Sequence, residues 1–442
     1  MSVRGRTAQL ILNPVIVFVV AGFGALYGAL SNMAVSWDGS YYLFNTLESQ
    51  QPFEPHLRFV NAITQAPTLI AQRFTDQLPL LRLMYGMTYM AVPLLALIAS
   101  WVVLRRGHRH MFVWPVLAVL VATLPGQVNA TCEALQSAQL VWPALLAAIV
   151  GVERGDRLAW FVIAISGLFA AVAHPYGVVL MAGVLVVCLL GRRKREAMLT
   201  AVLLVSAVAN AWWSFDPYES HQITTGVIHT GFMNAVWGGP MVAIGSSAIG
   251  AALIALGDRS RHRTLLAATG VACQFLALAS LVPWAASPTL WDGALDFRIF
   301  TPVVIVPMAI VALFDGRRSA PADLNWRQIA AVTAAAGFAA IMVVQGLSVQ
   351  RLDAALTDAI DSGTSGCVTQ ADIQGSQGTV LDAWSTPARS ILFGSRTPIA
   401  VVLPGNQCAA LDGSRVLPLA AGDGRPIDTP GWFDLTRLVR NP

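Results

Sequence analysis

Charged residues are scarce in this sequence of 442 residues. Asp, Glu, Lys and Arg make up only 12% of the chain, whereas hydrophobic residues make up 55%. An average soluble protein is about 25% charged, so this composition excludes an ordinary soluble domain and predicts an integral membrane protein. Lysine is almost missing, with Lys194 as the single example, and Arg, Ala, Val and Gly are abundant. This usage is typical of a bacterium with a GC-rich genome, and we therefore take the protein as bacterial.

Other features are missing as well. The net charge of +4 comes from short basic loops and not from one basic face, so nothing indicates nucleic-acid binding. There is no internal repeat and no pair of corresponding broken helices of the kind that marks many secondary transporters. No nucleotide-sugar motif is visible. The first apolar run is longer than the roughly 7–15 residues of a signal-peptide core, which predicts an uncleaved first span.

Long apolar runs define the expected architecture, because a helix needs roughly 20 apolar residues to cross a bilayer. The sequence predicts an α-helical polytopic membrane protein with about eleven transmembrane helices. These spans are expected near residues 10–32, 79–104, 111–125, 135–152, 158–173, 175–190, 197–213, 237–257, 264–284, 298–314 and 328–347.

Basic clusters fall in alternate loops, at residues 105–109, 153–157, 192–195, 259–263 and 317–318. Cytoplasmic loops carry an excess of Lys and Arg, so these loops and the N-terminus are expected in the cytoplasm. The protein is therefore predicted to be a multi-pass protein of the bacterial plasma (inner) membrane. Its functional residues are expected on the outer face, in segments that are acidic, aromatic or contain His.

The first outer loop, residues 33–78, has a helical pattern. Apolar residues recur at spacings of three and four along residues 60–74, which predicts one amphipathic helix. Residues 38–50 are a second, aromatic-rich helix candidate. Both are expected to lie on the membrane surface. Pro67, within the first stripe, leaves open the alternative that a new helix begins there.

The tail loses the long apolar runs. Residues 350–442 are predicted to form a small soluble α+β domain outside the cytoplasm, separate from a transmembrane domain at residues 1–349. Cys367 and Cys408 are its two cysteines, and an oxidising compartment allows them to form a disulfide. The other three cysteines lie in or beside spans and are expected to be packing residues.

Two short motifs lie on the predicted outer face. The first reads Trp37-Asp38-Gly39-Ser40-Tyr41-Tyr42-Leu43, and the second reads Asp296-Phe297-Arg298-Ile299-Phe300-Thr301-Pro302. Together with the order of elements over about the first 350 residues, they resemble the GT-C superfamily of polytopic glycosyltransferases. The first motif is similar to the Trp-Asp-x-x-Trp/Tyr-Tyr segment of mannosyltransferase branches, and the second to an Arg-Tyr/Phe-x-x-Pro motif. The chain departs from the acidic-pair form of the first motif, since Asp38 has no adjacent acid.

The resemblance implies a function. Asp38 is expected to be the general base, and Arg298 to face the phosphate of a polyprenyl-phosphate sugar donor. One sugar would pass, with inversion, to a cell-envelope glycan or glycolipid acceptor, and the partners would also include membrane lipids. The residue types suit the reaction, because a positioned carboxylate can contribute about 10²- to 10⁴-fold and the Arg fork matches phosphate oxygens. A GT-C-like bundle with outer-face surface helices is the expected fold.

Further candidates surround these two residues. The donor phosphate is expected to contact Arg298, His174, His56 and Arg58. The sugar and acceptor are expected to contact Tyr41, Tyr42, Glu133, Asp216, Glu219, His221, Asp292 and Asp296. No metal site is assigned, although Asp216, Glu219 and His221 have metal-ligand residue types. The sequence identifies no required cofactor and leaves a divalent cation, Mg²⁺ or Mn²⁺, open.

Each site has a simpler alternative. Asp38 is also a suitable N-cap residue, Arg298 a snorkelling anchor, and His174 an ordinary part of a His-Pro turn. Two other functions remain open. In a polymerase or ligase of polyprenyl-linked glycans, outer Arg and His residues would dominate. In a transporter or structural envelope protein, no chemical turnover would occur.

Overall fold

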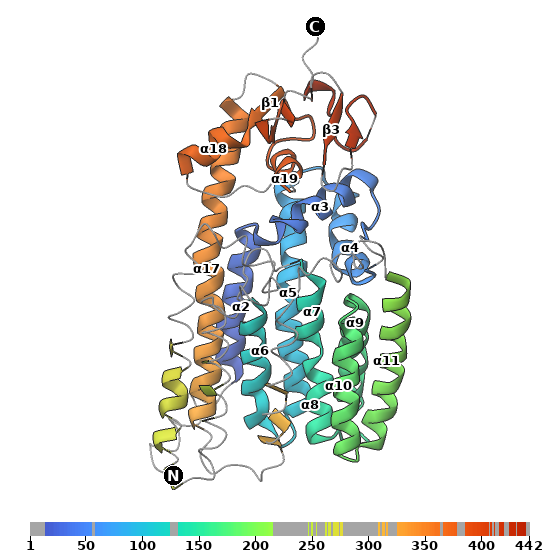
Figure 1. The fold of residues 1–442 in the computed structure, drawn as a ribbon, viewed down its shortest axis with the longest axis vertical. Coiled ribbons are helices and arrows are strands. Elements are labelled where there is room, and N and C mark those ends of the chain that lie inside the picture. Colours follow the sequence, from blue (N-terminus) through green and yellow to red (C-terminus); the bar gives the residue numbers. More distant parts are fainter. Residues whose placement is uncertain are drawn as a thin grey trace. The chain divides into compact units, whose positions relative to one another are not determined.

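The computed structural model describes most of the chain. The described residues are 14–54, 58–123, 131–214, 325–362, 366–377, 385–405, 407–408, 411, 415–419, 424–429 and 431–438, with scattered positions between 246 and 316. This part of the chain is mostly helical, with a small sheet region near the C-terminus (Figure 1).

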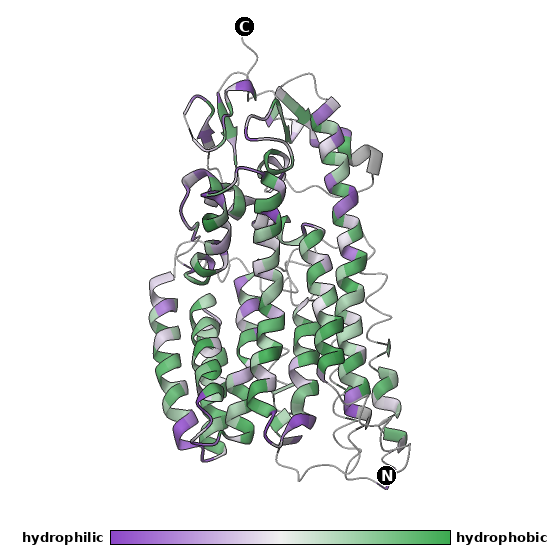
Figure 2. Ribbon diagram, turned by 180° about the vertical axis from the view of Figure 1, so that it is seen from behind, coloured by the Kyte–Doolittle hydropathy of each residue, from purple (hydrophilic) through white to green (hydrophobic). Residues whose placement is uncertain are grey.

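Four of the described helices are long and apolar enough to cross a membrane. They cover Leu78–Leu104, Glu133–Val150, Lys194–Ser214 and Arg327–Ser362. Hydrophobic residues make up much of the helical ribbon, and hydrophilic residues extend over the second half of the helix Asn325–Ser362 (Figure 2). This is compatible with the predicted helical membrane protein.

The prediction of about eleven spans is wrong for the part of the chain that the structure describes. Several expected spans are shorter apolar helices of 10–17 residues, namely Pro14–Leu30, Arg109–Thr123, Arg157–Ala173 and Gly177–Leu190. The turn at His174 and Pro175 separates two of them, Arg157–Ala173 and Gly177–Leu190. The expected spans at 237–257, 264–284 and 298–314 lie mostly outside the described residues.

The chain divides into two compact units. Unit 1 comprises Met1–Ala25, His56–Val60 and Ala91–Met342, and unit 2 comprises Leu26–Pro55, Asn61–Met90 and Val343–Pro442. The predicted domain boundary at residues 349 and 350 falls inside the continuous helix α17 (Asn325–Ser362). The predicted two-domain division itself stays a prediction.

Unit 1 is a bundle of apolar helices. Its elements are the first part of α2 (Pro14–Leu30), the last part of α5 (Leu78–Leu104), η3 (Arg109–Phe112), α6 (Val113–Thr123), α7 (Glu133–Leu140), α8 (Trp142–Val150), α9 (Arg157–Ala173), α10 (Gly177–Leu190), α11 (Lys194–Ser214) and the first part of α17. Helix α9 packs against α7, α8, α10 and α11. Large apolar side chains on the outer faces, such as Phe161, Val179 and Trp212, are exposed, as expected of helices that contact lipid.

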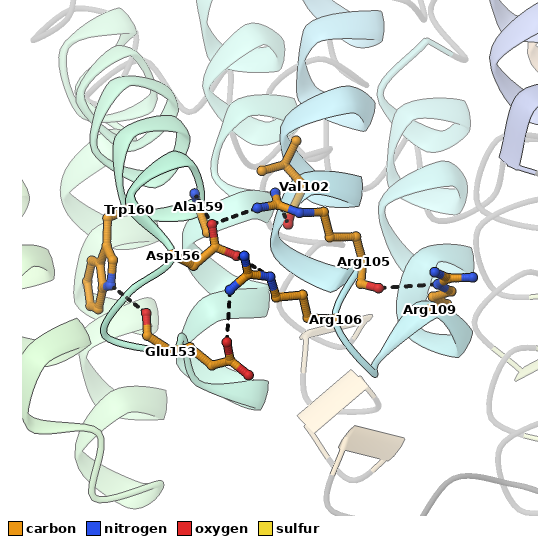
Figure 3. Close-up of polar contacts among 8 residues, drawn as sticks. All are labelled: Val102, Arg105, Arg106, Arg109, Glu153, Asp156, Ala159 and Trp160. Atoms are coloured by element: carbon orange, nitrogen blue, oxygen red, sulfur yellow. Dashed lines mark hydrogen bonds and ion pairs between the residues drawn. The ribbon is translucent and has the colours of Figure 1, made fainter.

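Asp156 fixes the loop between α8 and α9. Its carboxylate accepts a hydrogen bond from the Ala159 N–H (3.1 Å), which caps α9. The same carboxylate pairs with Arg105 (2.6 Å) and Arg106 (3.3 Å) from the end of α5 (Figure 3). Arg106 also pairs with Glu153 at 2.9 Å. Two of the predicted basic clusters therefore meet at one side chain.

Unit 2 contains the two helices predicted in the first loop. They are α3 (Asp38–Ser49) and α4 (Val60–Gln72), preceded by the short 3₁₀ helix η1 (Met33–Val35). Helix α4 continues through Pro67, so the alternative that a helix begins at this proline is wrong. The Gln65 side chain of α4 lies 2.9 Å from the Thr46 hydroxyl of α3 and also bonds the Phe53 backbone.

The tail of unit 2 has the predicted mixture of helices and strands. Its elements are β1 (Gly366–Thr369), α18 (Gln370–Gln377), α19 (Thr386–Phe393), β2 (Ala400–Leu403), β3 (Val416–Pro418), β4 (Gly424–Pro426) and η6 (Thr436–Leu438). Strands β1 and β2 are parallel, with Cys367 opposite Val401, and β3 and β4 are antiparallel. The predicted disulfide between Cys367 and Cys408 is present.

The hydrophobic core of the tail is shared with the second half of α17. Leu352, Leu356 and Ile360 of this helix pack with Ile373 of α18 and Val402 of β2. Burial of these side chains explains why α17 continues beyond its apolar run, which was expected to end at residue 347.

Candidate functional site

The turn that carries Asp38 has a strained backbone. Trp37 has φ of 51° and ψ of −129°, a combination that residues with a Cβ rarely adopt. Asn32, on the other side of η1, is left-handed with φ of 54°, which Asn tolerates better than most residues. A backbone outlier such as Trp37 costs roughly 1–3 kcal/mol and persists where surrounding contacts fix it, often at functional sites. We call residues 32–38 the Asp38 turn.

Asp38 itself opens helix α3. The N-cap position is Trp37, whose side chain makes no capping hydrogen bond, and Asp38 lies in the first turn. The N-cap position is thus one residue before Asp38, and the helix dipole favours a carboxylate in the first turn. Asp38 is half-buried. Its role as general base stays a prediction.

A buried ion pair contacts the Asp38 turn at two residues, Asn32 and Ser36. Arg389 of α19 donates from Nε to Asp353 Oδ1 of α17 at 2.9 Å, and a second bond from Nη2 reaches the same oxygen. Arg389 Nη1 also donates to Ser36 Oγ at 2.8 Å, and Asn32 Nδ2 donates to Asp353 Oδ2 at 3.4 Å. Asp353 and Arg389 are 7% and 3% exposed, so solvent screens this pair little.

Further contacts fix the segment beside the ion pair. Gln350 of α17 donates to the Ser31 hydroxyl at 3.3 Å. The Ser40 hydroxyl lies 2.9 Å from the Trp37 carbonyl and 3.2 Å from the Ser385 carbonyl, which directly precedes α19. The Asp38 turn is thus attached to two elements that lie more than 300 residues away in the sequence.

The other end of α3 also contacts the tail. Phe44 stacks on Phe433 with ring centroids 5.1 Å apart. Glu48 pairs with Arg425 at 2.6 Å and accepts a hydrogen bond from the Phe433 N–H at 3.0 Å. The tail therefore covers α3 along its length.

Tyr41 and Tyr42 lie in the core and do not form an open aromatic platform. Both are buried, and their ring centroids lie 5.3 and 5.7 Å from that of Phe53. This is ordinary aromatic packing. Their predicted contact with sugar gains no support from this arrangement.

Two of the other predicted residues meet in unit 1. Arg58 Nη1 lies 2.9 Å from Glu133 Oε2, and the two side chains are 10% and 2% exposed. Sequence reasoning assigned Arg58 to donor phosphate and Glu133 to sugar or acceptor. In the structure each neutralises the other, since a buried charge requires a partner.

Helix α7, which begins at Glu133, is buried at every position. Ser137 uses its hydroxyl to bond the Ala170 carbonyl of α9 at 2.5 Å. Gln136 is 2% exposed, and its two amide atoms have no hydrogen-bond partner among the described residues. Glu133 and Gln136 are three residues apart and share one face of the helix.

The His174 side chain contacts Tyr176 within its own turn. Its Nδ1 accepts the Tyr176 N–H at 3.2 Å, and the two rings lie 4.4 Å apart. The backbone extends at His174 and α10 begins at Gly177. These contacts match the predicted tight turn between two apolar helices and give no support to phosphate binding.

The remaining candidates lie outside the described residues. They are His56, Asp216, Glu219, His221, Asp292, Asp296 and Arg298. Within the part of the chain that the structure describes, no group of three His, Cys, Asp or Glu side chains is arranged to hold a metal ion.

Sequence reasoning missed Asp353, Arg389 and the role of Arg82. Arg82 of α5 donates to the Leu392 carbonyl at 2.6 Å and lies over the Phe393 ring at 3.9 Å. Asp353 lies a few residues after the last apolar run, where a charged side chain calls for a structural or functional explanation. Its position in the sequence could therefore have marked it as a candidate. Nothing in the local sequence marks Arg389 as its partner.

Comparison of the chain with models of protein families, with curated proteins and with solved structures finds no match.

Proposed function

We propose that the protein is a membrane glycosyltransferase of GT-C type that moves one sugar from a polyprenyl-phosphate donor to a cell-envelope glycan or glycolipid. The observation that carries the proposal is the Asp38 turn. The motif residue Trp37 has a strained backbone, and a buried network fixes the residues that precede Asp38. Strain that is fixed in this way is typical of functional sites.

Two further observations support the proposal. The first apolar helix is followed by two non-spanning helices, α3 and α4, and then by the long apolar helix α5, which is the order that the family resemblance implies. The Cys367–Cys408 disulfide supports an extracytoplasmic tail, because disulfides persist in oxidising compartments. In this proposal the N-terminus is cytoplasmic and the reaction takes place at the outer face of a bacterial plasma membrane.

The chemistry assigns one step to Asp38. Its carboxylate accepts the proton of the acceptor hydroxyl while the hydroxyl oxygen attacks the anomeric carbon. The bond from that carbon to the phosphate oxygen breaks, polyprenyl phosphate leaves, and the configuration inverts. A base within hydrogen-bond reach contributes about 10²- to 10⁴-fold. Arg298 is the proposed partner of the phosphate, because its planar fork matches phosphate oxygens.

The test uses the purified full chain in lipid with a panel of synthetic polyprenyl-phosphate sugars. Release of polyprenyl phosphate is followed for the wild type, Asp38→Asn and the control Asp76→Asn. Asp76 is an exposed acid of the same loop that pairs with Arg396 at 3.3 Å. The expected result is turnover in the wild type and the control and a loss of about 10²-fold or more in Asp38→Asn.

Equal turnover in Asp38→Asn and the wild type would rule out the base assignment. Greater sensitivity at His56, His174 or Arg298 than at Asp38 would favour a polymerase or ligase of polyprenyl-linked glycans. No turnover with any donor would contradict the enzyme proposal and favour a transporter or structural protein of the envelope.

A further inference from the structure

The tail contacts the Asp38 turn through a small number of polar atoms. Arg389 reaches Ser36, which is two residues before Asp38, and Asp353 reaches Asn32 at the start of the turn. The same two side chains bond each other. One ion pair therefore contacts the turn at two points, its first residue Asn32 and Ser36.

The backbone hydrogen bonds at the start of α3 depend on the position of Ser36. The Gly39 N–H bonds the Ser36 carbonyl at 3.0 Å, and the Ser40 N–H bonds the Trp37 carbonyl at 3.1 Å. If Ser36 moves, the first of these bonds and the direction of Asp38 at the start of α3 change with it. The strained Trp37 backbone would relax toward a more common conformation once the surrounding contacts no longer fix it.

A buried ion pair is poorly explained by stability alone. Removing two charges from water is costly, and well-packed apolar residues of similar volume often replace such pairs at no loss of stability. A pair that also bonds Ser36 and Asn32 has a different use, because charged hydrogen bonds are directional and fix the position of the groups that they join.

We propose that the C-terminal tail is a positioning element for Asp38, with Asp353 and Arg389 as positioning residues. This rests on the proposed function in so far as Asp38 is the catalytic base. The tail holds the turn that presents the carboxylate. A catalytic group displaced by about 1 Å can lose about 10²-fold in rate.

The main test variant is Asp353→Leu with Arg389→Met, which removes both charges and leaves apolar side chains in their place. The matched control is Glu48→Leu with Arg425→Met, which removes the tail's ion pair at the other end of α3. Two measurements are made on the full chain in lipid. Hydrogen exchange follows the Gly39 and Ser40 amides, and the donor assay gives kcat and KM separately.

In the main variant we expect these two amides to exchange about tenfold faster or more. We expect kcat to fall by about 10- to 100-fold while KM for the donor stays within about twofold. In the control, both amide exchange and kcat should stay within about twofold of the wild type. A purely structural role would not separate kcat from KM in this way.

Unchanged amide exchange in the folded main variant would overturn the proposal, and so would faster exchange without a loss of kcat. If the main variant does not fold, Arg389→Lys takes its place, because it keeps the charge and loses the fork that reaches Ser36 and Asp353 together. Faster exchange and a lower kcat are then expected, and wild-type values for both would overturn the proposal. Equal turnover in Asp38→Asn and the wild type would refute the base assignment and, with it, the link between the tail and catalysis. In that case, faster exchange of the Gly39 and Ser40 amides in the main variant would still show that the ion pair fixes the turn.

Discussion

Glu133 lies in a helix whose every residue is buried, and its partner is the buried guanidinium of Arg58 at 2.9 Å. An acid at such a position is costly unless it is paired. The pair is close to neutral as a whole, so Arg58 offers less net charge to a phosphate than an unpaired guanidinium would. The mutual contact therefore gives each residue a structural role that the sequence did not indicate.

We expect Glu133→Gln to destabilise the protein by about 3–5 kcal/mol, because it removes the negative charge that lies 2.9 Å from the buried Arg58 guanidinium. The double variant Arg58→Met with Glu133→Leu should recover most of this loss, since no buried charge remains. Unfolding in detergent of the wild type, Arg58→Met, Glu133→Leu and the double variant measures the coupling. Additive losses would contradict a direct and dominant interaction between the two side chains.

His108 gives the predicted cytoplasmic side a pH dependence. Burial, together with the nearby charge of Arg193, lowers the pKa of His108 from its usual value of 6.5. The unfolded chain then binds a proton more readily than the folded protein, so the stability from this group is fully present above the unfolded pKa and decreases as pH falls through it. We expect His108→Gln to weaken the loss of stability between about pH 7 and pH 5. Thermal unfolding of both proteins across this range is the measurement, and identical pH profiles would contradict the assignment.

At the scale of elements, Asp156 combines two tasks. It caps α9 through the Ala159 N–H and pairs with Arg105 and Arg106 of the preceding loop (Figure 3). We expect Asp156→Ala to be less stable than Asp156→Asn by about 1 kcal/mol, because Asn keeps a cap acceptor and loses only the charge. Thermal unfolding at low and high salt separates the two effects. The loss in Asp156→Asn should shrink at high salt, whereas the difference between the two variants should not. Equal stability of the two variants would show that the cap contributes nothing.

Local patterns predicted the helices well. The apolar spacing of residues 60–74 gave α4, and the charge-free runs around His174 and Pro175 gave α9 and α10 with the turn between them. The end of α17 was missed because its last turns carry Arg351, Asp353 and Asp358, which end an apolar run without ending a helix. Their apolar neighbours are buried by the tail, a contact that no local pattern contains.

The candidate site was predictable in part. Asp38 stood out because an acid directly follows the first apolar run, and the structure adds the strained Trp37 beside it. The pairing of Asp353 with Arg389, and of both with the Asp38 turn, joins residues up to 353 positions apart. Such contacts depend on tertiary packing, and spacing within one segment does not reveal them.

At the scale of the whole molecule, unit 2 is built from three separate stretches of chain. Residues 26–55 and 61–90 pack with residues 343–442, which include the tail. The Asp353–Arg389 pair, the Glu48–Arg425 pair and the Phe44–Phe433 stack all join distant parts of this unit. Truncation of the tail would therefore remove contacts from the first 50 residues as well.

The orientation of the chain can be tested through its cysteines, in a background where Cys132, Cys188 and Cys273 are replaced by Ala. The Cys367–Cys408 disulfide and the positive-inside rule both predict that the tail lies outside the cytoplasm. We expect a membrane-impermeant maleimide to label the tail in intact spheroplasts only after treatment with an impermeant reductant.

The matched control is Arg154→Cys with both tail cysteines changed to Ser, since Arg154 is exposed in a basic loop predicted to be cytoplasmic. This cysteine should react only after the membrane is permeabilised. If the reduced tail is labelled only after permeabilisation, the tail lies in the cytoplasm. Asp38 would then lie on the cytoplasmic side as well, because α3 is bonded to the tail, and a reaction at the outer face would be ruled out.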